Sequence, residues 1–239
     1  MIDYQVIQDI AIKSQTNEEN VIREYLQNLF LQSFYRQDKS ENFLFKGGTA
    51  LRLAFESPRF SEDLDFSGIK NGKNYEEILL SVMEAIDKEG IDHELIESKS
   101  TSGDWLAIPN FNIYDRKINI RNEISFRKKK LAKENKLISP KIIPAYRLVL
   151  LAPKIMVREK FQAAISRQKE RDFFDLYFIL RNPQLREYVS LTEKQQEKLI
   201  QILKEIKADD IERALKYLVP ISFRPVIKGL PNRIIKELK

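Results

Sequence analysis

Two aspartates at alternate positions, Asp63 and Asp65, form the strongest chemical signal in the sequence. In an extended strand, side chains two residues apart project from the same face, so both carboxylates can serve one site. Mg²⁺ and Mn²⁺ prefer such oxygen ligands, and Mg²⁺ is usually held by one or two carboxylates together with substrate phosphates. Because bound ions can activate a hydroxyl and stabilise a leaving pyrophosphate, the pair predicts phosphoryl or nucleotidyl transfer.

A glycine turn precedes the pair, where Lys46, Gly47, Gly48 and Thr49 follow a short apolar run and open a predicted helix over 49–55. Backbone N–H groups at a helix start carry partial positive charge, and glycines let a phosphate approach them closely. The turn therefore predicts a triphosphate site, to which the threonine hydroxyl adds a contact. Each part also has a structural interpretation, as a plain turn, a helix cap and a solvated strand edge.

Arg59 and Ser61 stand immediately before the acid pair, where they can contact a phosphate or the base. Arg59 is equally compatible with an exposed loop that follows Pro58. We therefore expect both residues to contribute to nucleotide binding, but rank them below the carboxylates and the glycine turn as candidates.

The periodicity of apolar residues predicts an α/β organisation for the first part of the chain. Two helices are expected within 5–36, a further helix at about 75–89, and short strands at 43–46, 64–66, 91–98, 105–114 and 117–126. After a basic segment at 127–141, only helical periodicities are found from Tyr146 to Leu238. We therefore expect a sheet domain at 1–140 and a helical domain at 141–239.

Composition limits the chemistry that the chain can perform. There is no cysteine and only one histidine, so zinc sites built from cysteine and histidine are excluded and carboxylates must bind any metal. A net charge of +6 favours polyanionic partners, and the basic residues of 127–141 can hold an RNA backbone or simply form a solvated linker. No apolar stretch is long enough to span a membrane, and no signal peptide is recognisable, so we expect a cytoplasmic protein without a membrane partner.

The motif KGGTALRLAF…SPRFSEDLDFSG resembles the nucleotidyltransferase toxins of the AbiEii type, a branch of the DNA polymerase β-like superfamily. The later segment LAPKIMVREKFQAAISRQKERDFFDLYFIL is similar to that family's downstream lysine and Arg-Asp-x-x-Asp helices. The resemblance implies a mixed polymerase β-like sheet flanked by helices and followed by a C-terminal helical bundle.

The resemblance also implies roles for single residues. Gly48 and Thr49 stand in place of the superfamily's Gly-Ser, with Asp63 and Asp65 as its metal-binding carboxylates. Lys154 is expected to be the catalytic or nucleotide-binding lysine.

Two acids complete the expected site. Asp172 is expected to be the late catalytic aspartate, and Asp175 lies on the same helix face, where an ion-pair network is the alternative role. The third metal carboxylate of the superfamily is expected at Glu123, with Asp115 as the poorer alternative.

The function implied by the resemblance is that of a type IV (AbiE-like) toxin–antitoxin or phage-defence nucleotidyltransferase. It would transfer NMP from a nucleoside triphosphate (NTP) to an acceptor, with tRNA modification at the 3′ end as the expected reaction and a separate antitoxin protein as its partner. Two alternatives stay open: transfer to a protein or small-molecule hydroxyl, and a non-catalytic module that only binds nucleotide or RNA.

Overall fold

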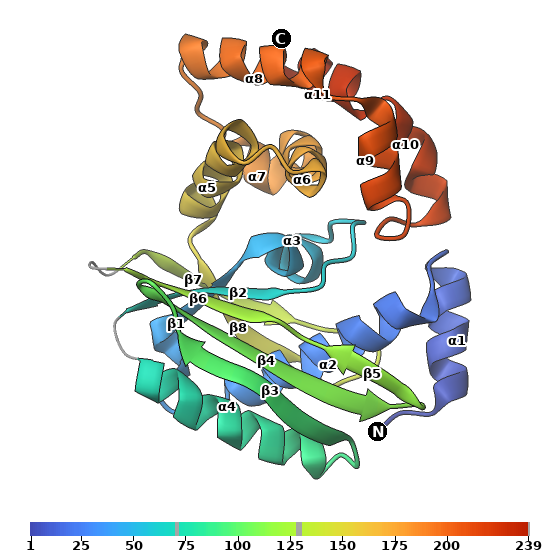
Figure 1. The fold of residues 1–239 in the computed structure, drawn as a ribbon, viewed down its shortest axis with the longest axis vertical. Helices are drawn as coiled ribbons and strands as arrows, with labels where there is room; N and C mark the ends of the chain where they lie inside the picture. Colours follow the sequence, from blue (N-terminus) through green and yellow to red (C-terminus); the bar gives the residue numbers. More distant parts are fainter. Residues whose placement is uncertain (70–71, 128–130, 239) are drawn as a thin grey trace.

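A mixed sheet forms one half of the molecule in the computed structural model, which describes residues 1–69, 72–127 and 131–238 (Figure 1). Within those residues the sheet has eight strands, in the order β3-β4-β6-β2-β1-β8-β7, with β5 paired to β4. The strands are β1 (Phe43–Lys46), β2 (Leu64–Ile69), β3 (Asp92–Ser100), β4 (Asp104–Ile113), β5 (Arg116–Asn119), β6 (Asn122–Arg127), β7 (Lys133–Ile138) and β8 (Tyr146–Leu151). The pairs β2–β6 and β1–β8 are parallel and the others antiparallel, so the mixed sheet expected from the sequence is confirmed.

Helices cover both faces of this sheet. Those of the first half are α1 (Tyr4–Lys13), α2 (Glu18–Phe34), α3 (Gly47–Phe55) and α4 (Gly72–Asp87). Phe34 of α2 and Tyr75 of α4 pack with Phe43 and Phe66 of the sheet, with ring centroids 5.1 to 6.3 Å apart, and so cover one face. Helix α3 lies on the opposite side, between the sheet and the remaining helices (Figure 1).

The start of α2 shows how the local sequence sets a boundary. The Asn17 side chain accepts a hydrogen bond from the Asn20 backbone N–H at 2.8 Å, and Glu18 and Glu19 occupy the first turn. An amide cap and early acidic residues satisfy and complement the positive end of a helix. The two helices predicted within 5–36 are therefore confirmed.

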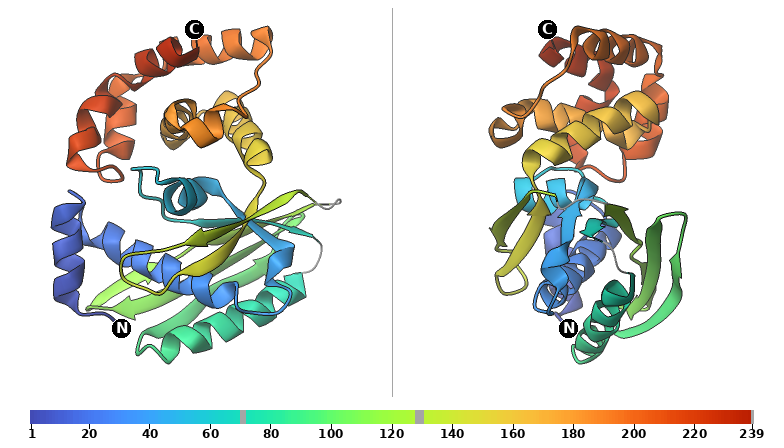
Figure 2. Two further views of the ribbon diagram at one scale, coloured as in Figure 1. Left: turned by 180° about the vertical axis from the view of Figure 1, so that it is seen from behind. Right: turned by 90° about the vertical axis from the view of Figure 1, so that its left-hand side faces the viewer.

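The helical half begins immediately after β8. Its helices are α5 (Pro153–Ser166), α6 (Glu170–Arg181), α7 (Pro183–Arg186), α8 (Glu193–Glu205), α9 (Ala208–Leu215), α10 (Arg224–Lys228) and α11 (Leu230–Leu238). Figure 2 shows from two further directions that these helices stack over the sheet half on the side of α3.

The prediction of purely helical structure from Tyr146 onwards is wrong for residues 146–151, which form β8 inside the sheet. The run YRLVLL is almost continuously buried, and periodicity cannot distinguish a buried strand of this kind from a buried helix turn. Part of the predicted basic linker is likewise strand β7, while its residues 128–130 lie outside the described residues. The division into domains at residue 140 stays a prediction.

The two halves are joined at a second place besides the β8–α5 connection. The backbone N–H of Phe60, in the loop before the acid pair, donates to the Leu218 carbonyl at 2.7 Å. The Asn20 side-chain amide donates to the Tyr217 carbonyl at 2.6 Å. The segment after α9 is thereby fixed to the loop that leads into Asp63.

None of the helices in the described part of the chain combines the length and the apolar character that crossing a membrane requires.

Candidate active site

The acid pair lies at the start of β2, in the middle of the sheet. Asp65 is the register partner of Lys46 in β1 and of Glu123 in β6. Residues in register on neighbouring strands project from the same face, so these side chains share the face that meets the helical half. The predicted strand at 64–66 is confirmed and extends to Ile69.

A cavity of about 430 Å³ opens over the pair. Every residue that lines it is charged, polar or glycine: Gly48, Arg59, Ser61, Glu62, Asp63, Asp65, Arg121, Glu123, Lys160, Arg167, Lys169, Arg171, Asp172 and Asp175. The first eight come from the sheet half and the last six from α5, α6 and their connection. The cavity therefore spans the two halves and suits a highly charged ligand better than an apolar one.

Burial perturbs both aspartates. It raises the pKa of Asp63, an effect that the nearby Arg171 guanidinium partly opposes from 3.6 Å. It also raises the pKa of Asp65, opposed by the Lys160 charge and reinforced by Asp63. Within the described residues the Asp65 carboxylate has no hydrogen-bond or ion-pair partner. The pair is thus a concentration of negative charge that the protein leaves incompletely compensated.

This donor set fits a hard divalent cation. Two incompletely compensated carboxylates at the start of β2 supply the oxygen ligands that Mg²⁺ uses, and open cavity remains for substrate oxygens. The described part of the chain holds no group of three or more Asp, Glu, His or Cys side chains arranged around a metal position. Asp63 and Asp65 would therefore hold an ion together with substrate, without an all-protein cage.

The structure does not bring the predicted third carboxylate into such a group. Glu123 lines the cavity, but its carboxylate accepts a hydrogen bond from Arg121 Nε at 2.5 Å and is half exposed. Asp115 lies in the turn between β4 and β5, outside the cavity lining. The reason is the local pairing of Glu123 with the arginine two residues before it, which the sequence pattern did not reveal.

Gly47 and Gly48 allow other side chains of the protein to approach the start of α3 closely. Gly47 has φ +87°, and a Cβ there would lie 2.0 Å from Asp65 Oδ2. A Cβ on Gly48 would lie 2.4 Å from an Arg59 terminal nitrogen and 2.7 Å from Ser61 Oγ. The side chain of the N-cap residue, Lys46, makes no capping hydrogen bond to the first turn of α3. Gly48 lines the cavity, so the uncapped helix start is close to the acid pair.

Two residues of the predicted triphosphate turn lie differently from the prediction. Thr49 is fully buried, and its hydroxyl donates to the Asp63 carbonyl at 2.5 Å, so it positions the strand and does not line the cavity. Lys46 is bound to Glu159 at 3.2 Å and lines a smaller adjoining cavity of about 150 Å³, which shares Asp65 and Lys160 with the larger one.

A buried ion-pair cluster ties α5 and α6 to the loop before the pair. Asp175 accepts from Arg59 Nε at 2.9 Å and from Lys160 Nζ at 2.6 Å. Burial disfavours the Asp175 carboxylate, but the charges and hydrogen bonds of Arg59 and Lys160 outweigh burial and lower its pKa. Arg59 is only 2% exposed, so the alternative of an exposed loop arginine is wrong, and the ion-pair role considered for Asp175 is present.

Asp172 is held in a similar way. Its carboxylate is buried and accepts two hydrogen bonds from Arg167, at 2.8 Å from Nε and 2.6 Å from Nη2. Both residues line the cavity. The bidentate pair fixes the connection between α5 and α6, which also carries Lys169 to the cavity.

The lysine at the acid pair is Lys160, and the sequence reasoning that selected Lys154 missed it. Lys154 is exposed and lines a different cavity on the outer side of α5. The local pattern does not distinguish the two lysines, because tertiary packing decides which face of α5 meets the sheet half. Lys160 follows Lys154 by about 600° of helix rotation, so the two side chains lie on different faces of α5.

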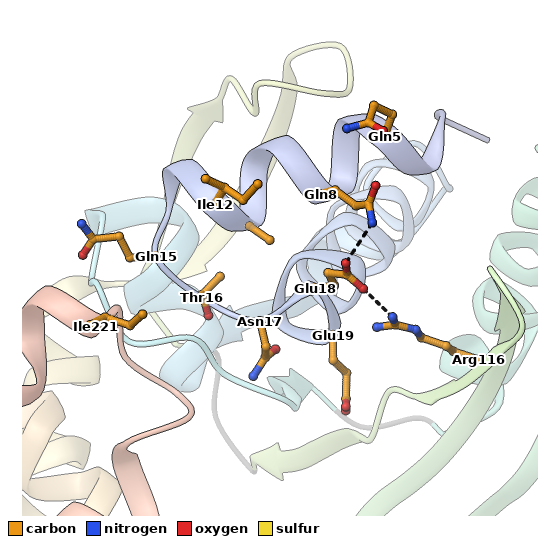
Figure 3. A pocket seen from close by; sticks show the side chains of 11 residues that line it. Gln5, Gln8, Ile12, Gln15, Thr16, Asn17, Glu18, Glu19, Arg116 and Ile221 are labelled. Carbon is orange, nitrogen blue, oxygen red and sulfur yellow. Dashed lines mark hydrogen bonds and ion pairs between the residues drawn. The ribbon is translucent and has the colours of Figure 1, made fainter.

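A separate hollow of about 790 Å³ lies between α1 and the start of α2 (Figure 3). Figure 3 shows Gln8 and Arg116 both directed at Glu18, which accepts from Gln8 at 3.3 Å and is paired with Arg116. Because its arginine is already neutralised by a carboxylate, this hollow lacks the uncompensated charge found at the acid pair.

The family model of the nucleotidyl transferase AbiEii toxin of type IV toxin–antitoxin systems matches residues 29–227, a range that includes both aspartates and the α5–α6 cluster. No curated protein matches the sequence.

Solved structures with the same fold include JHP933 from Helicobacter pylori, 22% identical, with a TM-score of 0.63 and coverage of 93% of this chain and 94% of that one. A putative nucleotidyltransferase from H. pylori is also 22% identical, with a TM-score of 0.62 and coverage of 93% and 97%. MenT4, a nucleotidyltransferase toxin from Mycobacterium tuberculosis, is 17% identical, with a TM-score of 0.62 and coverage of 100% and 89%. Because the family model matches most of the length of this chain, the chain belongs to the AbiEii family of nucleotidyl transferase toxins.

Proposed function

We propose that this toxin transfers a nucleotidyl group from an NTP to the 3′-terminal hydroxyl of a tRNA, in a reaction that depends on Mg²⁺ or Mn²⁺ at Asp63 and Asp65. The observation that carries the proposal is the incompletely compensated acid pair facing a cavity lined by cations from the other half of the molecule. Anions and cations placed in this way match a metal–triphosphate substrate.

The divalent cation, when bound, would supply charge neutralisation at the reacting phosphate. The residues of the chain then have separate tasks. Asp63 and Asp65 would hold the ion, and Lys160, fixed by Asp175 at 2.6 Å, presents its charge beside Asp65. Arg171 and the exposed Lys169 approach the cavity from the start of α6 and can neutralise oxygens of the triphosphate.

The transfer requires no reactant other than the NTP and the acceptor hydroxyl. The acceptor hydroxyl oxygen forms a bond to the α-phosphorus while the bond to the bridging oxygen breaks. Pyrophosphate leaves, and the hydroxyl proton passes to solvent. The uncapped start of α3 at Gly48 supplies backbone N–H groups on the side where charge collects.

An RNA acceptor is supported by charge and by family. Arg121 and Lys169 stand among the cavity residues and are exposed to a polyanion that approaches from outside, and the whole chain carries a net charge of +6. Type IV membership supports a cognate antitoxin as the protein that restrains this activity in the cell.

The test is to incubate the purified protein with Mg²⁺, each labelled NTP in turn and total tRNA, followed by separation of RNA, protein and small molecules. An Asp63→Ala, Asp65→Ala variant should lose RNA labelling, whereas Asp38→Ala, which changes an exposed aspartate outside the cavity, should keep it. Label on protein or on a small molecule would overturn the tRNA acceptor, and no transfer from any NTP despite nucleotide binding would overturn the enzymatic proposal.

A further inference from the structure

The outer side of α5 carries a cavity that the proposed reaction does not use. It measures about 340 Å³ and lies between α5 and residues 188–195, which comprise part of the α7–α8 connection and the first turn of α8. Figure 1 places these elements on the side of the helical half away from α9 and α10. Its volume lies at the lower end of the range for ligand-binding pockets.

The floor of this cavity is apolar. Val157, Phe161 and Ile165 of α5 are 1%, 4% and 7% exposed, and Tyr188 and Leu191 contribute half-buried side chains from the opposite wall. An apolar side chain placed here would leave water and contact carbon atoms on two sides. The floor therefore favours a ligand with an apolar part.

The rim of the same cavity carries two positively charged side chains. Lys154 and Arg158 are one helical turn apart on α5, and both are exposed. Among the described residues neither forms an ion pair, and the described lining contains no aspartate or glutamate. Lys160 further along α5 and Arg167 immediately after it are, by contrast, each bound to a carboxylate.

The opposite wall is fixed before any ligand arrives. Thr192 caps α8 in a reciprocal arrangement, in which the Gln195 backbone N–H donates to Thr192 Oγ1 at 3.3 Å and the Thr192 N–H donates to Gln195 Oε1 at 3.0 Å. Gln195 itself lines the cavity. A preformed wall reduces the ordering cost of binding.

We infer that this cavity docks an acidic, amphipathic segment of a partner protein. An apolar side chain would occupy the floor, while carboxylates one helical turn away would pair with Lys154 and Arg158. A nucleic-acid backbone would meet the two cations but leave the apolar floor unused, so charge and shape together favour a peptide. The docking surface is separate from the active-site cavity, because the two linings share no residue.

The test uses a defined probe, a fluorescein-labelled helical peptide with two leucines four residues apart and a glutamate one turn from each. Fluorescence anisotropy should show saturable binding to the wild-type protein, and at least tenfold weaker binding of a peptide with lysine in place of glutamate. The Lys154→Glu, Arg158→Glu variant should lose affinity for the acidic peptide at least tenfold. Hydrogen exchange should slow in residues 188–195 when the acidic peptide is bound.

Lys198→Glu is the matched control, since this exposed lysine of α8 lies outside the cavity lining and its reversal should leave binding unchanged. Equal affinity of the acidic peptide for the wild type and the double variant, with both folded by circular dichroism, would overturn the proposal. So would concentration-dependent dimerisation of the wild type that the double variant loses, because the surface would then serve a second copy of the chain.

Discussion

At the scale of single residues, the distinction that matters is whether a charge has a partner. Asp172 and Asp175 are buried and fully engaged by arginine and lysine, which is how proteins normally accommodate interior carboxylates. Asp65 is buried to a lesser degree, yet no hydrogen bond or ion pair reaches it from the described residues. Its raised pKa expresses a free-energy cost that a bound cation would remove.

Asp65→Asn should therefore stabilise the metal-free protein while abolishing nucleotidyl transfer. A carboxyl whose folded pKa is raised destabilises the fold when ionised, so the cost is present at neutral pH and disappears as pH falls through the raised pKa. We expect a gain of about 1 kcal/mol, or roughly 2–4 °C in Tm by calorimetry with chelator present. The gain should vanish in acid, and a lower Tm at neutral pH would contradict the assignment.

Lys160→Ala should reduce transfer by about a hundredfold or more, because it removes a fixed positive charge beside Asp65. Lys154→Ala is the informative comparison on the same helix, since Lys154 lies in another cavity, and its transfer rate should stay within about threefold of wild type. Single-turnover rates with saturating NTP would measure both. The reverse order of effects would restore the role that the sequence first suggested for Lys154.

At the scale of elements, the strand–turn–helix unit from β1 to α3 is built around the close approach of Asp65 to Gly47. Gly47→Ala places a methyl group against the Asp65 carboxylate in a backbone conformation that L residues rarely adopt. We expect a loss of more than about 1 kcal/mol in the free energy of unfolding, measured by urea denaturation, together with weaker metal binding.

Gly90→Ala separates the two causes of that loss. Gly90 has φ +77°, similar to Gly47, but a Cβ there would meet no atom within 4 Å. The loss of stability caused by backbone strain should therefore occur in both variants. The loss caused by the contact with Asp65 should occur only in Gly47→Ala. Equal destabilisation and equal metal affinity would show that the contact is unimportant.

Prediction from the sequence succeeded for elements with strong local signals. The start of α2 was recognisable from its capping residue Asn17, and the strand at the acid pair from the spacing of its two aspartates. Strand β8 was not, because a short run buried on both faces has no period. Lys160 and the Arg121–Glu123 hydrogen bond were missed for a different reason, since which helix turn or rotamer faces the site is decided by tertiary packing.

At the scale of the whole molecule, the active site exists only where two halves meet. The buried contact of Asp175 with Arg59 joins α6 to the loop before the pair, and Leu218 accepts a hydrogen bond from the same loop. The proposed metal ligands belong to one half, and Lys160 and the α6 cations belong to the other. Conditions that loosen the contact should therefore reduce catalysis before they unfold the sheet.

Asp175→Asn should cost about 3–5 kcal/mol at neutral pH, because it leaves Arg59 and Lys160 buried without their counter-charge. The lowered pKa of Asp175 means that its contribution is complete above the pKa of an unfolded aspartate, about 4, and is lost as pH falls further. Urea denaturation at pH 7 and at pH 3 should thus give a large and a much smaller difference between variant and wild type. A difference independent of pH would argue against an electrostatic origin.

The contact between the Phe60 N–H and the Leu218 carbonyl joins segments that are synthesised at very different times. A ribosome that has finished β2 has already made Asp63 and Asp65, but Lys160, Asp175 and Leu218 are added later. A nascent or prematurely terminated product would carry the acid pair without the cations that complete the cavity. We therefore expect transfer activity only from chains long enough to include Leu218, so translation that stops soon after β2 should yield an inactive product.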